Sequence, residues 1–528
     1  MTSPSVQISS IDKSYYIPRI TNELTAFVGH FERGPIDVPV YITNIDQFKF
    51  LFGRGVNEFH QDWYQVYNFL QYASGLWVVR TAGMKRSNAD SINTTPVDVN
   101  TFTDWESKKD SISTDTIRFI ARTPGQWGNL LSVVTFNEEH WNNDDLISDG
   151  YTAKNIIGYF EPNYICICVF RNGTLVETFY KLLSEINNIN DDSLYIYTTI
   201  NPAITIDFFA SINTFQLING FSSWPSDARL KESYSLFDDT YNIDIIIGNE
   251  RSNNVAIEHA ETQKNCIAFI GLPTKTLNIL VFLMGAGIPD EIAYTPDGKL
   301  ITLSKDENIV NTINAETLTK LKDYVNALPQ SQYVHFTANI KVQLDMFTNK
   351  YKLVNVAGDI AGLKAQASLI SPWNTSAGLE RGVVKNLKNI LLTYNDKYKS
   401  DLYKLGVNYF EKNVMMTQRT FYTRPSSFNS VNIRSLFNHI EKETKRILNY
   451  SVFEENTYQV RQSIATRLKL YLENIKLEKG ITDARLRVHP GEENEIIVDI
   501  QIKPAYITEY ISIRITNTGT SELTDNVG

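Results

Sequence analysis

Cysteine and histidine are the residues in this sequence best able to bind a metal, and their spacing argues against a metal site. Cys166 and Cys168 place two thiols on one face of a predicted strand, which is half of a tetrahedral zinc site. Cys266 is far away along the chain, and the seven histidines contain no His-Glu-x-x-His or other close pair. We therefore interpret the paired cysteines as small buried core residues and expect no metal site.

Glycine-rich loops could hold a phosphate, and two candidates occur. Neither Gly53-Arg-Gly55 nor Gly285-Ala-Gly287 is followed by Lys-Ser or Lys-Thr, and neither completes the dinucleotide-binding fingerprint. A Gly-x-Ser-x-Gly nucleophile elbow is absent, and no pair of carboxylates can be singled out for acid/base work. We expect no catalytic residue, no cofactor and no enzymatic activity. The alternative is a hydrolase that uses carboxylates between residues 220 and 345.

Composition limits the class of protein. A chain of 528 residues is too long for one core, so we expect three or four domains. Its 50 Lys+Arg against 59 Asp+Glu give a net charge of -9, which argues against a nucleic-acid coat. The N-terminus has no signal-peptide pattern, no apolar run is long enough for a membrane span, and three cysteines give no disulfide framework. We expect a folded protein made in a reducing cytoplasm.

Two amphipathic helices are predicted near the C-terminus, over residues 434–448 and 458–477. We expect Glu441, Lys442, Glu443 and Lys445 of the first helix to face away from its apolar side. The apolar positions are Leu436, Phe437, Ile440, Ile447 and Leu448 in the first helix, and Val460, Ile464, Leu468, Tyr471, Leu472 and Ile475 in the second.

After these helices the apolar period changes from about 3.6 to two, which is typical of half-buried strands. A strand this close to a chain end can pair with its own sheet or with the sheet edge of another subunit. A weaker alternation occurs in the polar arm at the other end of the chain. The predicted strand residues are Val6 and Ile8 near the N-terminus, and Val498, Ile500, Ile502, Ile511, Ile513 and Ile515 near the C-terminus.

Upstream of the C-terminal helices the pattern is mixed. Residues 24–80 indicate a small α/β unit with strands near 26–29, 39–42 and 77–80. Residues 84–219 are rich in Asn, Asp, Ser and Thr and indicate an inserted, mostly β segment. Later, two short apolar strands (243–247 and 266–270) and a helix near 317–328 indicate a second α/β domain.

A local excess of basic residues lies within residues 431–480, which contain nine Lys/Arg and six Asp/Glu. A solvated helix face explains such a pattern most simply. The alternative is a docking surface for an acidic protein partner, and Arg461, Arg467 and Lys469 are then its candidate residues.

Several stretches taken together resemble the tail sheath proteins of contractile-tailed bacteriophages. The resemblance leaves residues 85–120 and 135–220 unmatched. Where an aspartate is expected soon after the Ala361-Gly-Leu363 run, this chain has Ala365-Gln-Ala-Ser368, so the resemblance implies no role for an acidic residue there. The matching stretches are Ala26-Phe-Val-Gly-His-Phe-Glu-Arg-Gly-Pro35, Phe48-Lys-Phe-Leu-Phe-Gly53, Asn68-Phe-Leu-Gln-Tyr-Ala-Ser-Gly-Leu-Trp-Val-Val-Arg80, Thr123-Pro-Gly-Gln-Trp-Gly-Asn129, Ala357-Gly-Asp-Ile-Ala-Gly-Leu363, Ser371-Pro-Trp373, Ala377-Gly-Leu-Glu-Arg-Gly382, Leu402-Tyr-x-x-Gly-Val-Asn408, Asn432-Ile-Arg-Ser-Leu-Phe437 and Phe453-Glu-Glu-Asn456.

The resemblance implies an α+β multidomain fold, with an α/β C-terminal domain common to the family, strand-donating arms at both ends and a mostly β inserted outer domain. On this basis we divide the chain into an N-terminal arm (1–20), a small α/β unit packing with the core (21–84), the inserted outer domain (85–219), an α/β middle domain (220–344), a C-terminal sheath domain facing the tube (345–505) and a C-terminal arm (506–528).

The resemblance also implies a structural role. Such subunits stack as hexameric rings around an inner tail tube, and contraction drives the tube through the bacterial envelope for genome delivery. On this basis Arg461, Arg467 and Lys469 are the residues expected to face the tube. The implied partners are further copies of the chain, the inner tube protein, and baseplate and tail terminator proteins at the ends, without direct nucleic-acid contact or membrane insertion. The implied location is the virion tail, assembled in the host bacterial cytoplasm. The sheath of a tailocin or a type VI-like injection system is the alternative within this class.

Overall fold

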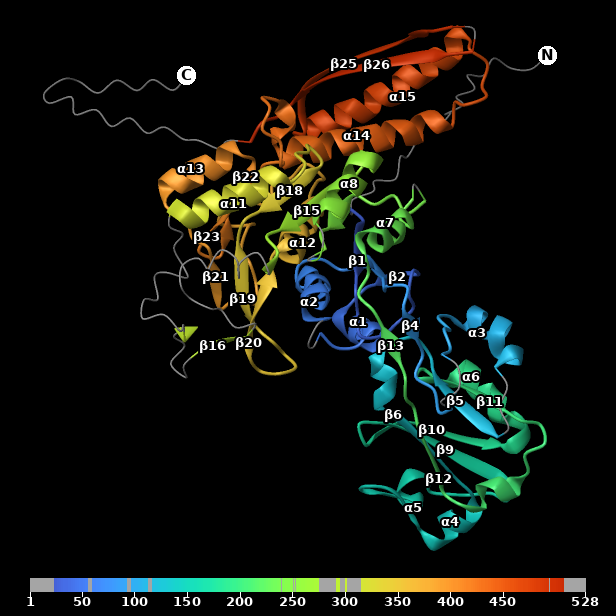
Figure 1. Ribbon diagram of the computed structural model, residues 1–528. Coiled ribbons are helices and arrows are strands. Elements are labelled where there is room, and N and C mark those ends of the chain that lie inside the picture. Colours follow the sequence, from blue (N-terminus) through green and yellow to red (C-terminus); the bar gives the residue numbers. More distant parts are fainter. Residues whose placement is uncertain are drawn as a thin grey trace, which may run out of the picture. The chain divides into compact units, whose positions relative to one another are not determined.

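The computed structural model describes residues 23–55, 59–92, 96–112, 116–238, 240–249, 251, 253–274, 291–294, 300–301, 315–492 and 494–507. The chain divides after Asn438 into two compact units. The first contains a mixed α/β body with a β-rich insertion, and the second contains the later part of one C-terminal helix, all of the next helix and a hairpin (Figure 1). Among the helices of the described residues, none is long and apolar enough to cross a membrane.

A seven-stranded sheet forms the centre of the first unit. Neighbouring strands are parallel, except that β2 and β3 are antiparallel. The sheet takes strands from three segments that the sequence analysis placed in separate domains. In spatial order the strands are β2 (Pro39–Ile42), β3 (Leu76–Arg80), β1 (Thr25–Gly29), β14 (Ile245–Ile247), β15 (Ile267–Gly271), β18 (Val334–Thr337) and β22 (Val407–Asn408).

Helices cover both faces of this sheet. Alternate residues of β1 enter different cores, because Ala26 and Val28 face one side and Phe27 faces the other. Burial on both faces explains the continuous apolar run of β14. The first core includes side chains of α7 (Asp227–Ser235), α8 (Asn253–Gln263), α11 (Ala315–Ala327) and α13 (Asp396–Lys404), and the second includes those of α1 (Ile45–Phe52), α2 (His60–Phe69) and α12 (Ala357–Ser368).

A second, antiparallel sheet continues from the first, since β19 begins directly after β18. Ile340 and Val342 of β19 belong to the first core, and Val354 of the neighbouring strand belongs to the second. The strands in spatial order are β17 (Leu300–Ile301), β16 (Glu291–Tyr294), β20 (Tyr351–Asn355), β19 (Ile340–Leu344) and β21 (Asn389–Leu391), and a separate hairpin is formed by β23 (Phe410–Glu411) and β24 (Val414–Met415).

The insertion lies between β3 and α7. It leaves and returns as paired strands, β4 (Arg86–Ser87) and β13 (Phe221–Ser222). Cys166 and Cys168 are buried in β9 with their sulfurs 3.7 Å apart, which confirms them as core residues. The other elements are the sheet β10 (Thr174–Leu182), β9 (Tyr164–Arg171), β6 (Leu131–Phe136) and β12 (Asn213–Gln216), the pairs β5 (Ile117–Ala121) with β11 (Ile196–Ile200) and β7 (Leu146–Ser148) with β8 (Tyr151–Thr152), and the helices α3 (Phe102–Lys108), α4 (Glu138–Asn143), α5 (Ala153–Ile156) and α6 (Ile189–Asp192).

In the second unit, α15 (Tyr458–Leu477) packs against the hairpin of β25 (Ile481–Pro490) and β26 (Ile496–Pro504). The Thr457 side chain accepts a hydrogen bond from the Val460 backbone and begins α15. Both predicted C-terminal helices are confirmed, because α14 (Val431–Asn449) contains the other one. The buried side chains of α15 are Ile464, Leu468, Tyr471, Leu472 and Ile475, which matches the predicted stripe except for the half-buried Val460.

Two details of the second unit differ from expectation. We expected Glu443 to face solvent, and this is wrong. Its side chain is only 7% exposed and accepts hydrogen bonds from Arg446 Nε at 3.0 Å and Nη2 at 2.6 Å. A partner one turn along the helix thus allows the carboxylate to be buried. In addition, β25 was not among the predicted strands.

Candidate assembly site and interdomain joint

Within the described residues, the β25–β26 hairpin of the second unit is a two-stranded sheet with an unpaired outer edge on each strand. Its cross-strand pairs include Leu486 with Ile500 and Val488 with Val498. In the part of the chain that the structure describes, no further strand pairs with the outer edge of β25 or of β26. Strands of 10 and 9 residues therefore present two rows of backbone N–H and C=O groups that an added strand could use.

One face of the hairpin is apolar and only partly covered. The half-buried side chains of this face include Leu486, Val488, Val498, Ile500 and Ile502, although β25 packs against α15. The opposite face is charged, with exposed Arg485, Arg487, Asp499 and Lys503. An additional alternating strand at either edge would extend the apolar face over α15 and bury more of it.

The predicted strand-exchange residues are only partly within the described residues. Val498, Ile500 and Ile502 lie in β26, which confirms the predicted strand, and they pair with β25 of the same chain. Val6, Ile8, Ile511, Ile513 and Ile515 lie outside the described residues. Exchange of strands between subunits therefore stays a prediction.

The three basic residues predicted to face the tube all lie on α15, but they do not form one stripe. At about 100° per residue, Arg467 and Lys469 lie about 240° and 80° around the helix from Arg461. Arg461 donates to the Asn456 carbonyl at 2.9 Å and so supports the turn before α15. Lys469 is exposed. Contact of these residues with a tube stays a prediction, and Lys469 is the most suitable of them for a test.

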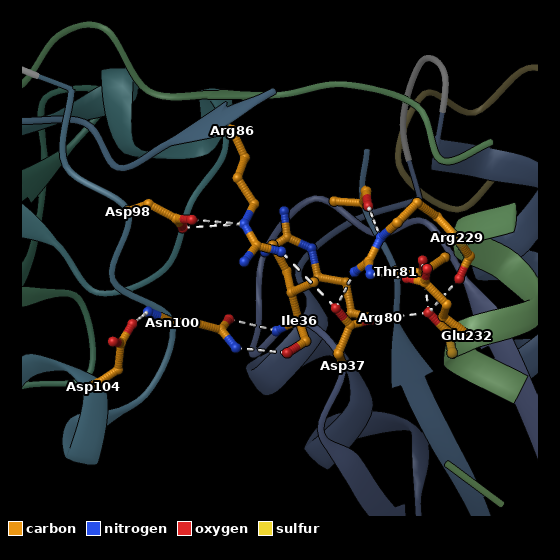
Figure 2. A network of polar contacts seen from close by, with 12 residues as sticks. Ile36, Asp37, Arg80, Thr81, Arg86, Asp98, Asn100, Asp104, Arg229 and Glu232 are labelled. Atoms are coloured by element: carbon orange, nitrogen blue, oxygen red, sulfur yellow. Dashed lines mark hydrogen bonds and ion pairs between the residues drawn. The ribbon is translucent and has the colours of Figure 1, made fainter. Parts of the chain in front are cut away.

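A network of polar contacts joins the insertion to the body of the first unit (Figure 2). The backbone N–H of Ile36 donates to Asn100 Oδ1 at 2.6 Å, and Asn100 Nδ2 donates back to the Ile36 carbonyl at 2.6 Å. Asp104, in the first turn of α3, accepts a hydrogen bond from the Asn100 backbone and fixes the segment that carries this amide. The side-chain amide of Asn100 thus both accepts from and donates to the Ile36 backbone, as a neighbouring strand would.

Asp37 is a second contact in Figure 2 and sits between two arginines. Its carboxylate pairs with Arg229 of α7 and lies 3.9 Å from Arg86 Nη1 of β4. It also accepts a hydrogen bond from Ser233 Oγ at 2.8 Å. Arg86 in turn donates from Nε to both carboxylate oxygens of Asp98 in the insertion, at 3.1 and 2.9 Å. This chain of charges connects α7 of the body to the first residues of the insertion.

Arg80, at the end of β3, is the most deeply buried cation of the joint. Its guanidinium donates to the carbonyls of Phe31 at 3.0 Å, Gly34 at 2.7 Å and Pro124 at 2.9 Å. Burial lowers the pKa of Arg80 to about 9, an effect that nearby Arg86 increases and Glu32 opposes. Because Pro124 belongs to the insertion, one planar side chain ties both parts together.

The stretch around Pro124 packs closely on this arginine. Gly125 has φ of 139°, a conformation that favours glycine, and a Cβ there would lie within a tight 3.1 Å of Arg80 Nη2. Nearby, Glu32 pairs with Arg171 of β9 at 2.8 Å, and the Arg33 guanidinium lies over the ring of Trp127 at 5.8 Å. The insertion is therefore fastened to the body at several separate points.

No family model matches the chain. It is 30% identical over 201 residues to the tail sheath protein of Vibrio phage KVP40, a match that covers 36% of this chain and 30% of that protein. It is 24% identical over 416 residues to the tail sheath protein of Enterobacteria phage T4, covering 70% of this chain and 58% of that protein. The resemblance to phage tail sheath proteins is confirmed.

A third relative is the tail sheath protein of Salmonella phage ViI. The matches span between 30% and 58% of the length of these three curated relatives. All three have the name of a structural tail component, which agrees with the prediction that this chain is not an enzyme. Among the described residues, no group of three His, Cys, Asp or Glu side chains could hold a metal ion.

Two solved structures have the same fold. The sheath tail protein from Desulfitobacterium hafniense superposes with a TM-score of 0.55 at 11% identity, covering 94% of this chain and all of that one. The sheath tail protein from Listeria innocua gives a TM-score of 0.55 at 13% identity, covering 92% of each chain. At these identities the likeness concerns the fold alone.

The stretch Ala357-Gly-Asp-Ile-Ala-Gly-Leu363, one of those that resemble the sheath proteins, lies in α12, which is buried along nearly its whole length. A Cβ at Gly358 would lie 2.2 Å from the Gln65 carbonyl oxygen of α2, and one at Gly362 would lie 2.6 Å from Tyr72 Cδ2. The two glycines are four residues apart and therefore share one helix face. This stretch serves close helix packing, and its spacing of glycines was the sequence signal for it.

The stretch Ala365-Gln-Ala-Ser368, where an aspartate was expected, lies at the end of the same helix. Its last residue, Ser368, donates a short hydrogen bond from Oγ to the Glu23 carboxylate. Glu23 also lies 2.8 Å from Lys364 Nζ of α12. A carboxylate from far along the chain thus stands beside the helix. Sequence reasoning missed Glu23, because no local pattern indicates a pairing with Lys364, which lies 341 positions further along the chain.

Proposed function

We propose that this chain is the subunit of a contractile phage tail sheath. It polymerises as stacked hexameric rings around an inner tail tube, and contraction drives the tube through the bacterial envelope for genome delivery. The observation that supports this most is the similarity to the T4 tail sheath protein over 70% of the chain. Its partners are other copies of itself, the tube protein, and baseplate and terminator proteins, and its place is the virion tail. The same architecture would serve the sheath of a phage-derived injection particle.

Assembly proceeds by strand addition at the hairpin. The C-terminal arm (506–528) and the N-terminal arm (1–20) of neighbouring subunits add to the open edges of β25 and β26. The apolar alternation of Ile511, Ile513 and Ile515 suits the partly covered face of the hairpin. Each main-chain hydrogen bond contributes about 0.5–1.5 kcal/mol net, so a few per arm hold neighbours together while other contacts change.

Contraction then requires two packings of the same subunits. Its free energy lies in interfaces that differ between the extended and contracted arrangements. The joint around Arg80, Asp37 and Asn100 supports transmission of force, because the insertion is held to the body by buried and charge-assisted contacts on several sides. The insertion therefore follows its own body when subunits rearrange.

The experiment is negative-stain electron microscopy of the purified chain at high concentration, alone and with its tube protein. We expect hollow striated tubes from the full chain and only soluble monomers after deletion of residues 1–12 or 508–528. Deletion of residues 521–528 alone is the matched control, since it leaves the predicted strand 511–515 in place. Normal tubes from either long truncation would refute strand exchange, and monomers of the full chain even with the tube protein would refute the sheath function.

A further inference from the structure

The start of the described chain is clamped firmly to the body of the first unit. The backbone N–H of Leu24 donates to Asp244 Oδ2 at 2.9 Å, and the Leu24 carbonyl accepts from the backbone N–H groups of Asp244 at 2.8 Å and Ile245 at 3.0 Å. These contacts place the residues before β1 against the start of β14. The described chain therefore begins from a fixed position at Glu23 and Leu24.

Lys364 of α12 provides a second clamp on the same residues. Its side chain is 1% exposed, and its Nζ lies 2.8 Å from the Glu23 carboxylate, 2.9 Å from Ser368 Oγ and 2.6 Å from the Pro372 carbonyl. A buried ammonium is costly unless a carboxylate compensates it. Here the compensating charge comes from Glu23 and not from the helix that carries the lysine. We call Glu23 and Leu24, the first described residues after the N-terminal arm, the arm root.

We propose that the Lys364–Glu23 ion pair is an anchor that fixes the point at which the chain passes from the N-terminal arm into the body of the first unit. Lys364 is thus a positioning residue for strand donation, and this inference rests on the proposed sheath function. The positions of Lys364 and of the arm root depend on each other, because the charge of the buried lysine is compensated only when Glu23 lies beside it. An arm that leaves from a fixed point reaches its acceptor edge at a higher effective concentration than one with a loose root.

The structure allows two effects of Glu23 to be tested separately, namely compensation of the Lys364 charge and anchoring of the arm root. Ser368 Oγ lies 2.9 Å from Lys364 Nζ, so an aspartate at position 368 can compensate the lysine from within α12. The double variant Glu23→Gln with Ser368→Asp keeps one buried pair but releases the arm root from it. The single variant Glu23→Gln leaves the buried lysine uncompensated and should destabilise the body of the first unit. A second, independent design is Lys364→Met with Glu23→Gln, which removes both charges.

The anchor is tested first on the free subunit, by the rate of tryptic cleavage after Arg19. In Glu23→Gln/Ser368→Asp we expect the melting temperature of the wild type but cleavage after Arg19 that is about fivefold to tenfold faster, with cleavage after Lys13 as internal control. Lys364→Met/Glu23→Gln should show the same acceleration. Wild-type cleavage rates in both double variants would overturn the anchor, whether or not the chain forms tubes.

Assembly gives the second readout. In sedimentation with the tube protein, we expect the subunit concentration needed for tubes to rise about fivefold to tenfold in both double variants. Assembly at the wild-type concentration by variants that melt like the wild type would show that the pair only compensates charge, and would overturn the positioning role. Failure of the wild type itself to assemble would contradict the sheath function instead, while the cleavage rates still decide the anchor.

Discussion

Replacing Gly358 by alanine gives the sharpest test of the packing between α12 and α2. A Cβ at this position would lie 2.2 Å from the backbone oxygen of Gln65 and 2.8 Å from its Cα. These are backbone atoms of a buried helix, so no flexible side chain can move aside. Restoring an ordinary contact requires the two helices to separate by about 1.2 Å, which forfeits a large part of the dispersion energy between them.

The expected loss of unfolding free energy in Gly358→Ala has three contributions. Overpacking of this kind costs about 1–3 kcal/mol, and contact with backbone places Gly358→Ala at the upper end. The hydrogen bond from the Gly358 backbone to Gln65 Oε1, at 2.7 Å, is strained by the same separation and adds about 1 kcal/mol. Higher helix propensity of alanine returns about 1 kcal/mol. The net effect is a destabilisation of about 2–3 kcal/mol.

Hydrogen exchange of the amides of α2 and α12 measures this effect locally, which suits a multidomain chain that need not unfold in two states. A loss of 2 kcal/mol corresponds to exchange about 30-fold faster. Gln366→Ala, at an exposed position of the same helix, is the matched control and should change the free energy by less than about 0.5 kcal/mol. Slower exchange in Gly358→Ala would mean that propensity outweighs packing, and would refute the reasoning.

Three further predictions concern the joint, pH and the helix surface. Asn100→Ala loses both hydrogen bonds to Ile36 and should lower the unfolding free energy by about 1–3 kcal/mol, measured by urea titration; an unchanged midpoint would exclude Asn100 from the joint. Burial lowers the pKa of His30 to about 4, below its unfolded value near 6.5, so its stabilisation is lost as pH falls from 6.5 toward 4. Between pH 7 and 5 this loss is about 2 kcal/mol, and His30→Asn should remove it from the pH dependence of unfolding. Lys469→Glu should weaken sedimentation with the tube protein while leaving thermal melting unchanged, and unaltered sedimentation would assign this residue to solvent.

Local patterns predicted the elements well where one face or both faces of an element are uniformly apolar. The helix at 458–477 followed from its stripe of aliphatic residues, and β14 followed from Ile245-Ile246-Ile247. β25 was missed because Arg485 and Arg487 alternate with only two large apolar residues. Glu443 was misplaced because a burial that depends on Arg446 cannot be read from the spacing of charges.

The candidate site was less predictable, because it depends on contacts between distant residues. The register of Thr25 with Ile245 brings β1 beside β14 across the whole insertion, and no local pattern indicates that pairing. The sequence indicated Arg80 only as part of a matching stretch, although its hydrogen bonds to the carbonyls of Phe31, Gly34 and Pro124 hold the joint. Among the described residues no other strand pairs with the hairpin, and any use of its edges by another subunit is a property of the assembly.

Covalent crosslinking within assembled tubes tests the central claim, strand addition between subunits. Ser512→Cys is combined with Arg487→Cys on β25 or with Gln501→Cys on β26, and assembled tubes are treated with a short bismaleimide. The three natural cysteines are buried, so they do not compete. The account predicts a ladder of covalently linked subunits for one of the two pairs. Tubes in which both pairs give only internally linked monomers, or no link, would contradict it.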